Sequence, residues 1–219
     1  MKLKSALGWL LAGTMAGPAL AAPVTLTFDE SGLASAASTS PAVANFYAGG
    51  TVAGITGPSY GATFGSYALA LAPASGSAAD NGTAGVLWLQ NRSVVQGSPQ
   101  SISLTVAPGF LGPFDFSWSA RDSFTVSLFD GANTLSQSFA PSGVSSGAFS
   151  AWTTASLSTG SMLVTRVTFA GGSNSLFLDN IRFDLQGPTG GTVPEPGSMA
   201  LAGLGLMAAW GASRRRRMG

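Results

Sequence analysis

Carboxylates are the side chains of this sequence best able to do chemistry. The chain contains no histidine and no cysteine. Ser-His-Asp and Cys-His catalysis, histidine-ligated zinc, thiol chemistry and disulfides are therefore excluded. An enzyme would have to use a carboxylate pair of the glycosidase kind. The acids between residues 22 and 192 are Asp29, Glu30, Asp80, Asp115, Asp122, Asp130, Asp179 and Asp184. No local motif marks two of them as a pair, so we expect no catalysis.

Asp179 is the carboxylate with the most informative neighbours. An unbroken strand over 177–185 would place its alternate residues on one face, which must be the core. These residues are Phe177, Asp179, Ile181, Phe183 and Leu185. A buried carboxylate is costly unless it is paired, hydrogen-bonded or metal-bound. Asp179 therefore caps a neighbouring loop, is turned outward by a bulge, or binds a structural Ca²⁺ with Asp29 or Glu30. We expect the hydrogen-bonded arrangement before the calcium site, and no other cofactor.

Aromatic side chains are the second kind of candidate, because they can stack on sugar rings. Trp118 lies in phase with Phe114 and Phe116, which indicates the core. Trp88 follows an apolar pair, so a buried position is equally consistent with its context. Trp152 lies among Ser, Thr and Ala and is the tryptophan that we expect to be exposed. It is the candidate glycan contact.

The elements that would position these residues are strands. Apolar and polar residues alternate in several short segments separated by Gly, Pro, Ser and Asn turns, and no internal segment shows sustained helical periodicity. The predicted strands are Val24–Phe28, Gly85–Leu89, Ser101–Val106, Phe114–Trp118, Phe124–Leu128, Leu135–Phe139, Met162–Phe169 and Ser175–Leu185. Asp130-Gly131 predicts a hairpin turn and Ala107-Pro108-Gly109 a second turn. The sequence thus predicts an all-β fold, an antiparallel β-sandwich or jelly roll.

Charge is concentrated at the two ends of the chain. Residues 22–192 contain eight acids and four arginines, so their net charge is −4, although the net charge of the whole chain is formally +1. Nucleic-acid binding requires a clustered basic surface, which this region lacks. We therefore expect no nucleic-acid partner.

The N-terminus has the pattern of a secretory signal peptide. Lys2 and Lys4 precede an apolar segment, and Ala19-Leu20-Ala21 is a small-x-small cleavage site. We predict a signal helix within residues 1–21, removed after Ala21, and hence export across the inner membrane.

The C-terminus combines three unlike features in a fixed order. Pro194-Glu195-Pro196 keeps the chain extended and accessible. An uncharged, mostly apolar segment follows, predicted as a transmembrane helix over 198–213. At about 1.5 Å per residue it is short for a membrane core of about 30 Å. The arginines after it stay cytoplasmic by the positive-inside rule. They are Arg214, Arg215, Arg216 and Arg217.

This tail resembles the PEP-CTERM protein-sorting signal of Gram-negative bacteria, over Val193–Arg217. The resemblance implies recognition and cleavage by an exosortase, with the inner membrane as the anchor before processing. It also implies a setting in which extracellular polysaccharide is made. Tails of this kind also carry the name ice-binding-protein C-terminal domain, which describes the tail and is no evidence of ice binding.

A second resemblance covers most of residues 25–184. Thr27-Phe28-Asp29-Glu30, Asn45–Gly50, Gly57–Phe64 and Leu178–Phe183 occur in an order that is similar to secreted, carbohydrate-binding jelly rolls. Such domains open with an "FDD"-like strand, where this chain has Glu30 in place of the second Asp, and close with a "DNI" strand. The resemblance implies the fold and no activity.

Together these features predict a signal peptide at 1–21, a β-sandwich at 22–186, a linker at 187–192 and a sorting signal at 193–217. The function we expect is that of an envelope-associated or extracellular protein, non-catalytic, with exopolysaccharide as its ligand. One alternative is a carboxylate-dependent polysaccharide hydrolase or lyase, which requires a close acid pair in a cleft. The other is a purely structural surface adhesin, which requires no exposed aromatic cleft.

Overall fold

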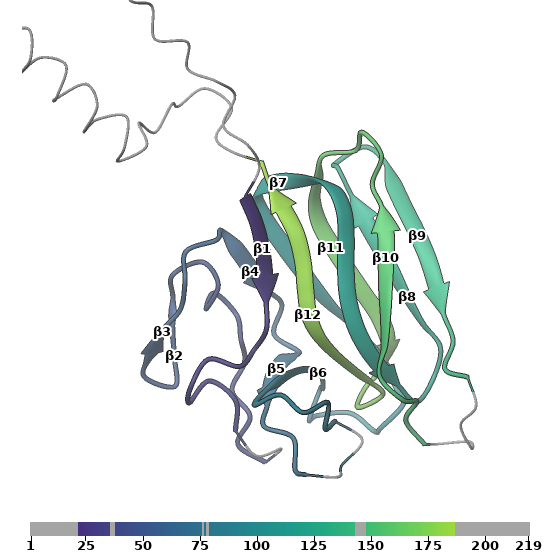
Figure 1. Cartoon of the computed structure of the whole chain (residues 1–219). Helices are drawn as coiled ribbons and strands as arrows, with labels where there is room; N and C mark the ends of the chain where they lie inside the picture. The colour runs from purple at the N-terminus through teal and green to yellow at the C-terminus, as the bar shows by residue number, and fades with distance from the viewer. Residues whose placement is uncertain (1–21, 36–37, 76, 78, 143–147, 187–219) are drawn as a thin grey trace, which may run out of the picture. The chain divides into compact units, whose positions relative to one another are not determined.

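A computed structural model describes residues 22–35, 38–75, 77, 79–142 and 148–186. Within these ranges the regular structure consists of strands, with no helix. The strands are β1 (Ala22–Leu26), β2 (Thr51–Val52), β3 (Ile55–Thr56), β4 (Ala62–Phe64), β5 (Ala68–Leu71), β6 (Val86–Leu89), β7 (Pro99–Ala120), β8 (Phe124–Phe129), β9 (Thr134–Phe139), β10 (Thr153–Ser158), β11 (Val164–Gly172) and β12 (Leu176–Leu185). The prediction of an all-β fold is confirmed (Figure 1).

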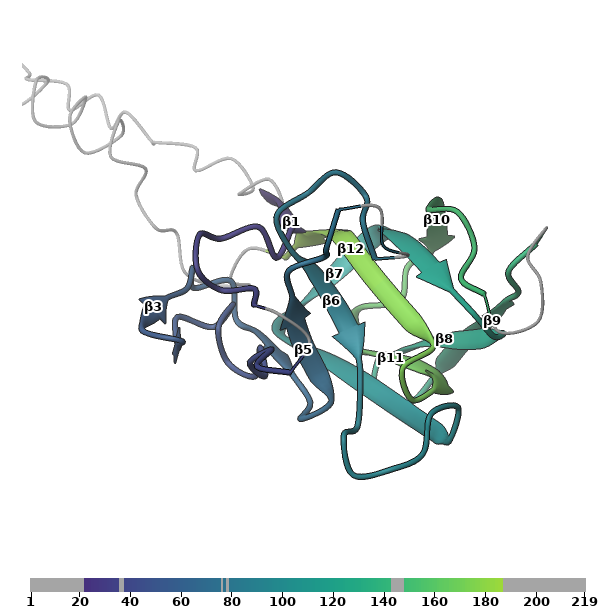
Figure 2. The ribbon, with the colours of Figure 1, turned by 90° about the horizontal axis from the view of Figure 1, so that it is seen from below.

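The pairs between named strands are antiparallel. β2 and β3 form a separate two-stranded sheet, and the other ten strands form two layers joined by β7. The first half of β7 pairs with β4 and β11, and the sheet continues through β8 to β9. The second half pairs with β12 and β10, and β12 also pairs with β6 and β1. The two layers face each other as a β-sandwich (Figures 1 and 2).

The long strand β7 changes layer at a glycine-containing bend. Phe110 pairs with Val164 of β11 and also with Leu185 of β12, so it marks the corner. Gly109 and Gly112 on either side of it have φ of +73° and +86°, which favour residues without a Cβ. The predicted turn at 107–109 is therefore wrong as a chain reversal. The glycines bend a continuous strand instead of ending it.

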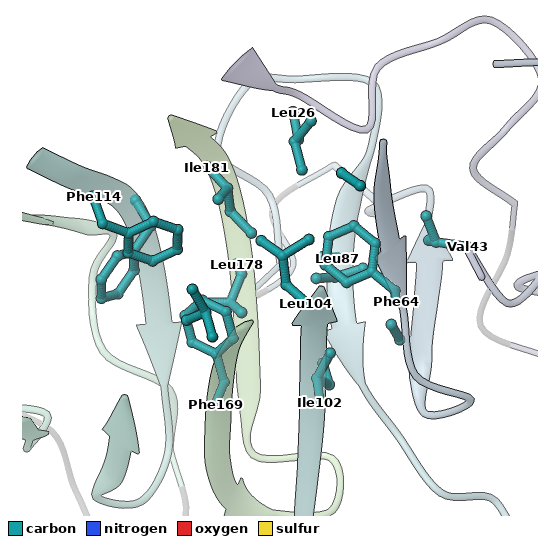
Figure 3. Packing of buried hydrophobic residues seen from close by; sticks show 14 of the residues in the cluster. Leu26, Val43, Phe64, Leu87, Ile102, Leu104, Phe114, Phe169, Leu178 and Ile181 are labelled. Atoms are coloured by element: carbon teal, nitrogen blue, oxygen red, sulfur yellow. The ribbon is translucent and has the colours of Figure 1, made fainter. Parts of the chain in front are cut away.

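The inner faces of the two layers form the main hydrophobic core. The alternating burial of β8, with Phe124, Val126 and Leu128 inside, is the pattern expected of a strand with one face in the core. Leu178 and Ile181 of β12 lie near Phe169 of β11 in this core (Figure 3). Its aromatic rings pack edge to face and offset, as in the Phe116–Phe169 pair at 5.5 Å between centroids.

Several sequence predictions of elements are confirmed. β8 and β9 form the expected hairpin around Asp130-Gly131, with Gly131 at φ +95°. Trp118 is buried in the core. β1 and β12, the first and last strands, are neighbours. The strands β2–β5 and β10 were not predicted, because they are short or rich in Ser, Thr and Ala.

The predicted signal helix and transmembrane helix lie outside the described residues. Among the residues that are described, no helix has the length and apolar character needed to cross a membrane. The boundaries of the signal peptide, linker and sorting signal stay predictions.

Candidate functional site

A row of polar side chains crosses four neighbouring strands on the outer face of one layer. Ser156 of β10 pairs with Asp115 of β7, Asp115 pairs with Arg182 of β12, and Arg182 pairs with Thr25 of β1. Residues directly opposite one another in antiparallel strands point to the same face. At a strand spacing of about 4.8 Å, the row extends about 14 Å. The fold thus gathers into one line residues that are far apart in the sequence.

These side chains line an open groove of about 430 Å³. A second polar row, formed by Thr154 and Ser117 with Asn180 beside them, also contributes to the groove. Asp115 and Arg182 lie opposite each other at its centre, surrounded by hydroxyl and amide groups. Such a surface offers both donors and acceptors and carries no strong net charge, which suits a ligand rich in hydroxyl groups.

The described part of the chain places no aromatic platform in the groove. Phe116 is the only aromatic residue among the described lining residues, and its side chain is 1% exposed and belongs to the core. A ligand would therefore be held by hydrogen bonds, without the stacking that aromatic rings provide.

Asp179, which pairs with the groove residue Ser117, is fully buried, as the sequence predicted. The prediction that it shares a face with Ile181 and Phe183 is wrong. The register of β12 against β7 shifts between Asp179 and Arg182, and Asn180 has φ +50°. This irregularity moves the alternation by one residue, so Ile181 and Phe183 face the main core, whereas Asp179 does not.

The carboxylate of Asp179 is surrounded by hydrogen-bond donors. The Asn180 backbone N–H donates to Oδ1 at 2.7 Å, and the side chains of Asn81, Asn180 and Thr83 donate to Oδ2 at 2.6, 3.1 and 3.3 Å. Burial nevertheless raises the pKa of Asp179 to about 6, and the negative charge of Asp29 acts in the same direction, against these hydrogen bonds. Of the arrangements expected, the structure combines a bulge with a hydrogen-bonded carboxylate.

Asp29 and Glu30 also make structural hydrogen bonds. Asp29 Oδ1 accepts the backbone N–H of Gly85 at 2.9 Å. Glu30 Oε2 accepts the hydroxyl of Tyr47 at 2.9 Å, and this hydroxyl accepts the N–H of Phe28 at 3.0 Å. Burial raises the pKa of Tyr47 far above its ordinary range, with a further contribution from Glu30. These bonds fix the segment after β1 against the loops.

Within the described ranges, no group of three or more Asp and Glu side chains is placed to hold a metal ion. The three acids of the calcium hypothesis are all occupied by protein donors. A calcium site at Asp179 with Asp29 or Glu30 stays a prediction.

Trp152 is not the exposed side chain that the sequence suggested. It is half-buried and packs against a second, smaller hydrophobic cluster outside the main core. This cluster comprises Leu69, Leu71, Ala79, Val86, Trp88 and Phe177, with Phe149 and Trp152 against it. Trp88 Nε1 donates to Asn174 Oδ1 at 2.9 Å. Local composition gave the wrong exposure for Trp152 because distant strands supply its neighbours.

The groove residues Thr25, Ser156 and Arg182 were not predicted as site residues. Thr25 and Arg182 alternate with apolar neighbours in predicted strands, whereas Ser156 lies in a strand that was not predicted. Only strand order and register could place the three in one row. The predicted processing and orientation residues lie outside the described part of the chain. They are Ala19, Ala21, Pro194, Glu195, Pro196, Arg214, Arg215, Arg216 and Arg217.

Comparison with family models identifies a PEP-CTERM protein-sorting motif at residues 192–217. The search of curated proteins gave no match. Among solved structures, the chain is similar to a family 29 carbohydrate-binding module, at 16% identity over 57% of this chain and 73% of that chain, with a TM-score of 0.32. It is also similar to a family 61 module in complex with β-1,4-galactotriose, at 12% identity over 56% and 88% of the two chains, with a TM-score of 0.37. These overlaps are partial, and nothing about a ligand follows from them.

Proposed function

We propose that this chain is exported, sorted by an exosortase, and resident in the cell envelope or extracellular matrix as a non-catalytic protein. The PEP-CTERM motif at residues 192–217 supports the sorting step. The predicted signal peptide at the other end supports export. Before processing, the apolar segment and the arginines after it would hold the C-terminus in the inner membrane, with the sandwich on the outer side.

We further propose that the groove on the outer face of the β10–β7–β12–β1 layer binds a polysaccharide. The observation that carries this proposal is the in-register row of Ser156, Asp115, Arg182 and Thr25. Hydroxyl, carboxylate and guanidinium groups in one line match the alternating donors and acceptors of a sugar chain. Because no aromatic side chain among the described groove residues is placed to stack on the ligand, we expect weak binding.

The groove does not support polysaccharide cleavage by the two-carboxylate mechanism. Of the described residues that line it, Asp115 is the only acid, and it lies opposite Arg182. Glycoside hydrolysis requires one acid as proton donor and another as base or nucleophile. Asp179 and Asp29 interact electrostatically, but neither lines the groove, and Asp179 is fully buried.

A structural adhesin is the second candidate function. The observation that favours it is that, in the ranges that the structure describes, no exposed aromatic side chain lines the groove. In that case the sandwich would act as a surface module without a specific glycan ligand.

A test of sorting is to replace Pro194, Glu195 and Pro196 with alanine in the full chain and to follow its mass in cells with and without exosortase. After removal of residues 1–21 in both strains, we expect the unaltered chain to lose its C-terminal segment only when the exosortase is present, and the variant to keep that segment in both strains. Loss of the C-terminal segment from the variant when the exosortase is present would contradict sorting through this motif.

A test of glycan binding is a glycan array with the exported chain, in calcium and again in chelator. Arg182→Ala should abolish selective binding. Arg166→Ala is the matched control, because Arg166 lies in the other layer with its guanidinium over Phe129 at 4.2 Å. Retained binding in Arg182→Ala would exclude the groove, and no binding by the unaltered chain would favour the adhesin. Loss of binding in chelator would support the calcium site.

A further inference from the structure

Strand β9 is an unprotected edge of the sandwich. Among the described residues it pairs on one side only, with β8. Its six residues, Thr134 to Phe139, include no charged residue and no proline, and their pairing with β8 shows no register shift. Five of the six are exposed and the last is half-buried. Natural edge strands are normally blunted by charge, proline or a bulge, and β9 has none of these.

Three other strands at the edges of the sandwich, β5, β1 and β4, are protected from further pairing. β5 is fully buried, and bridges from Ser35 and Ala42 cover its outer side. β1 begins with Ala22-Pro23, and proline cannot donate to a further strand. β4 contains only three residues. β9 and β10 lie together on the unprotected side (Figures 1 and 2). The chain thus blocks further pairing at some edges and leaves it open at others.

β9 has an exposed apolar side chain to bury, whereas β10 does not. Leu135 is 39% exposed and Phe139 is half-buried on the same face of β9. On β10 the corresponding residue, Leu157, is already buried at 2% exposure, and Ala155 is small. Pairing at β9 would therefore remove more apolar surface from water.

We propose that β9 is the site at which a second copy of this chain docks, with two β9 strands pairing antiparallel about a two-fold axis. An uncharged strand meets its own copy without repulsion, and a two-fold interface requires such self-complementarity. The pairing continues the β4–β7–β11–β8–β9 sheet from one copy into the other. It uses backbone groups on the side of β9 away from β8.

The side chains select the register. Residues that lie opposite each other in the two copies must point to the same face of the sheet. An axis between two residues would oppose neighbouring residues of β9, which point to different faces, so the axis must pass through a residue. An axis at Gln137 places Leu135 opposite the copy's Phe139, and Ser136 opposite the copy's Ser138. An axis at Ser136 would leave Phe139 without a partner. Ser136 and Ser138 already bond to hydroxyls on β8, at 2.8 Å to Ser127 and 3.2 Å to Thr125, so the row of hydroxyls would extend across both copies.

The test uses the absence of cysteine from the chain. In the full chain, Gln137→Cys places two thiols on the axis, where opposed Cα atoms are about 4.5–5.5 Å apart and within the range of a disulfide. Under mild oxidation by copper-phenanthroline, we expect a disulfide-linked dimer as the main product. Ser101→Cys, on the exposed outer face of β7, measures the background from random collision, and Ser156→Cys reports on the β10 edge.

Equal cross-linking of Gln137→Cys and Ser101→Cys would overturn the proposal, and so would dominant cross-linking of Ser156→Cys. A second measurement requires no cysteine. Sedimentation of the unaltered full chain should show concentration-dependent dimers, and Ser136→Lys should shift it to monomer, because a charge on the edge opposes pairing. Dimers that persist unchanged in Ser136→Lys would also refute the β9 interface. The result does not depend on whether the groove binds a glycan.

Discussion

Replacing Asp179 with asparagine should remove a specific pH dependence from the stability of the domain. The carboxylate is fully buried, and burial raises its pKa from 3.8 to about 6. The folded state therefore binds its proton more tightly than the unfolded state does. The stability from this group is fully present below about pH 4 and is lost as the pH rises through about 6. Above about pH 7 it contributes no further change.

The size of the effect follows from the difference between the two pKa values. A difference of about two units corresponds to about 3 kcal/mol, at 1.36 kcal/mol per unit. This is a large part of the 5–15 kcal/mol that is typical of single domains. Asn81, Thr83 and Asn180 donate to the ionised carboxylate and reduce the loss, but they do not offset burial.

The assay is urea unfolding of the unaltered chain and of Asp179→Asn between pH 4 and pH 7.5, followed by tryptophan fluorescence. Over this pH range we expect the free energy of unfolding to fall in the unaltered chain by about 2.5 kcal/mol more than in the variant. An amide among these donors has a cost of its own, which is the same at every pH and cancels in the slope. Equal slopes in the two proteins would refute the reasoning.

Two further variants sharpen this test. Asp29→Asn keeps an oxygen for the N–H of Gly85 but removes the neighbouring negative charge, so it should shift the fall in stability to lower pH. Asp130 serves as a control, because its pKa is shifted in the opposite direction. Hydrogen bonds from Asn133 and Ala132 lower its pKa, so its stabilising effect is present above its unfolded pKa and is lost as the pH falls. Asp130→Asn should therefore leave the fall between pH 4 and pH 6 unchanged.

Two further pairs of variants test a close backbone contact in a loop and the packing of the core. The free energy of unfolding of each variant is measured by chemical denaturation. Gly85→Ala should lower the free energy of unfolding by at least about 3 kcal/mol, because a Cβ would overlap the carbonyl oxygen of Phe28. Gly82→Ala should lower it by only about 1 kcal/mol, because a Cβ there meets open space and the only strain comes from its φ of +82°. Similar losses in the two variants would contradict the close approach at Gly85. Phe183→Ala should lower the free energy of unfolding by about 3–5 kcal/mol, because Phe183 is buried in the core. Leu163→Ala should lower it by less than about 0.5 kcal/mol, because Leu163 is 43% exposed. A small loss in Phe183→Ala would show that this part of the core is loosely packed.

Local patterns predicted the elements whose signals are strong. β8 alternates Phe124, Val126 and Leu128 with small polar residues, and Asp130-Gly131 supplies the turn, so the β8–β9 hairpin could be predicted in detail. β10 could not, because Thr153–Ser158 has a single large apolar residue, Leu157. Its assignment as a strand depends on its partner in β7, which no local pattern reveals.

The sequence by itself determined the sorting motif and the class of the fold. A sorting motif consists of consecutive residues, and strand alternation is a local property, so both can be recognised without tertiary structure. Only the tertiary structure determined which side chains lie beside one another and which of them face the core. A shift at Asn180 reversed the face of Asp179, and strand order brought Thr25 beside Arg182 and Asp115. Register between distant strands is set by the packing of the whole core, because a shift of one residue exchanges the two faces of a strand.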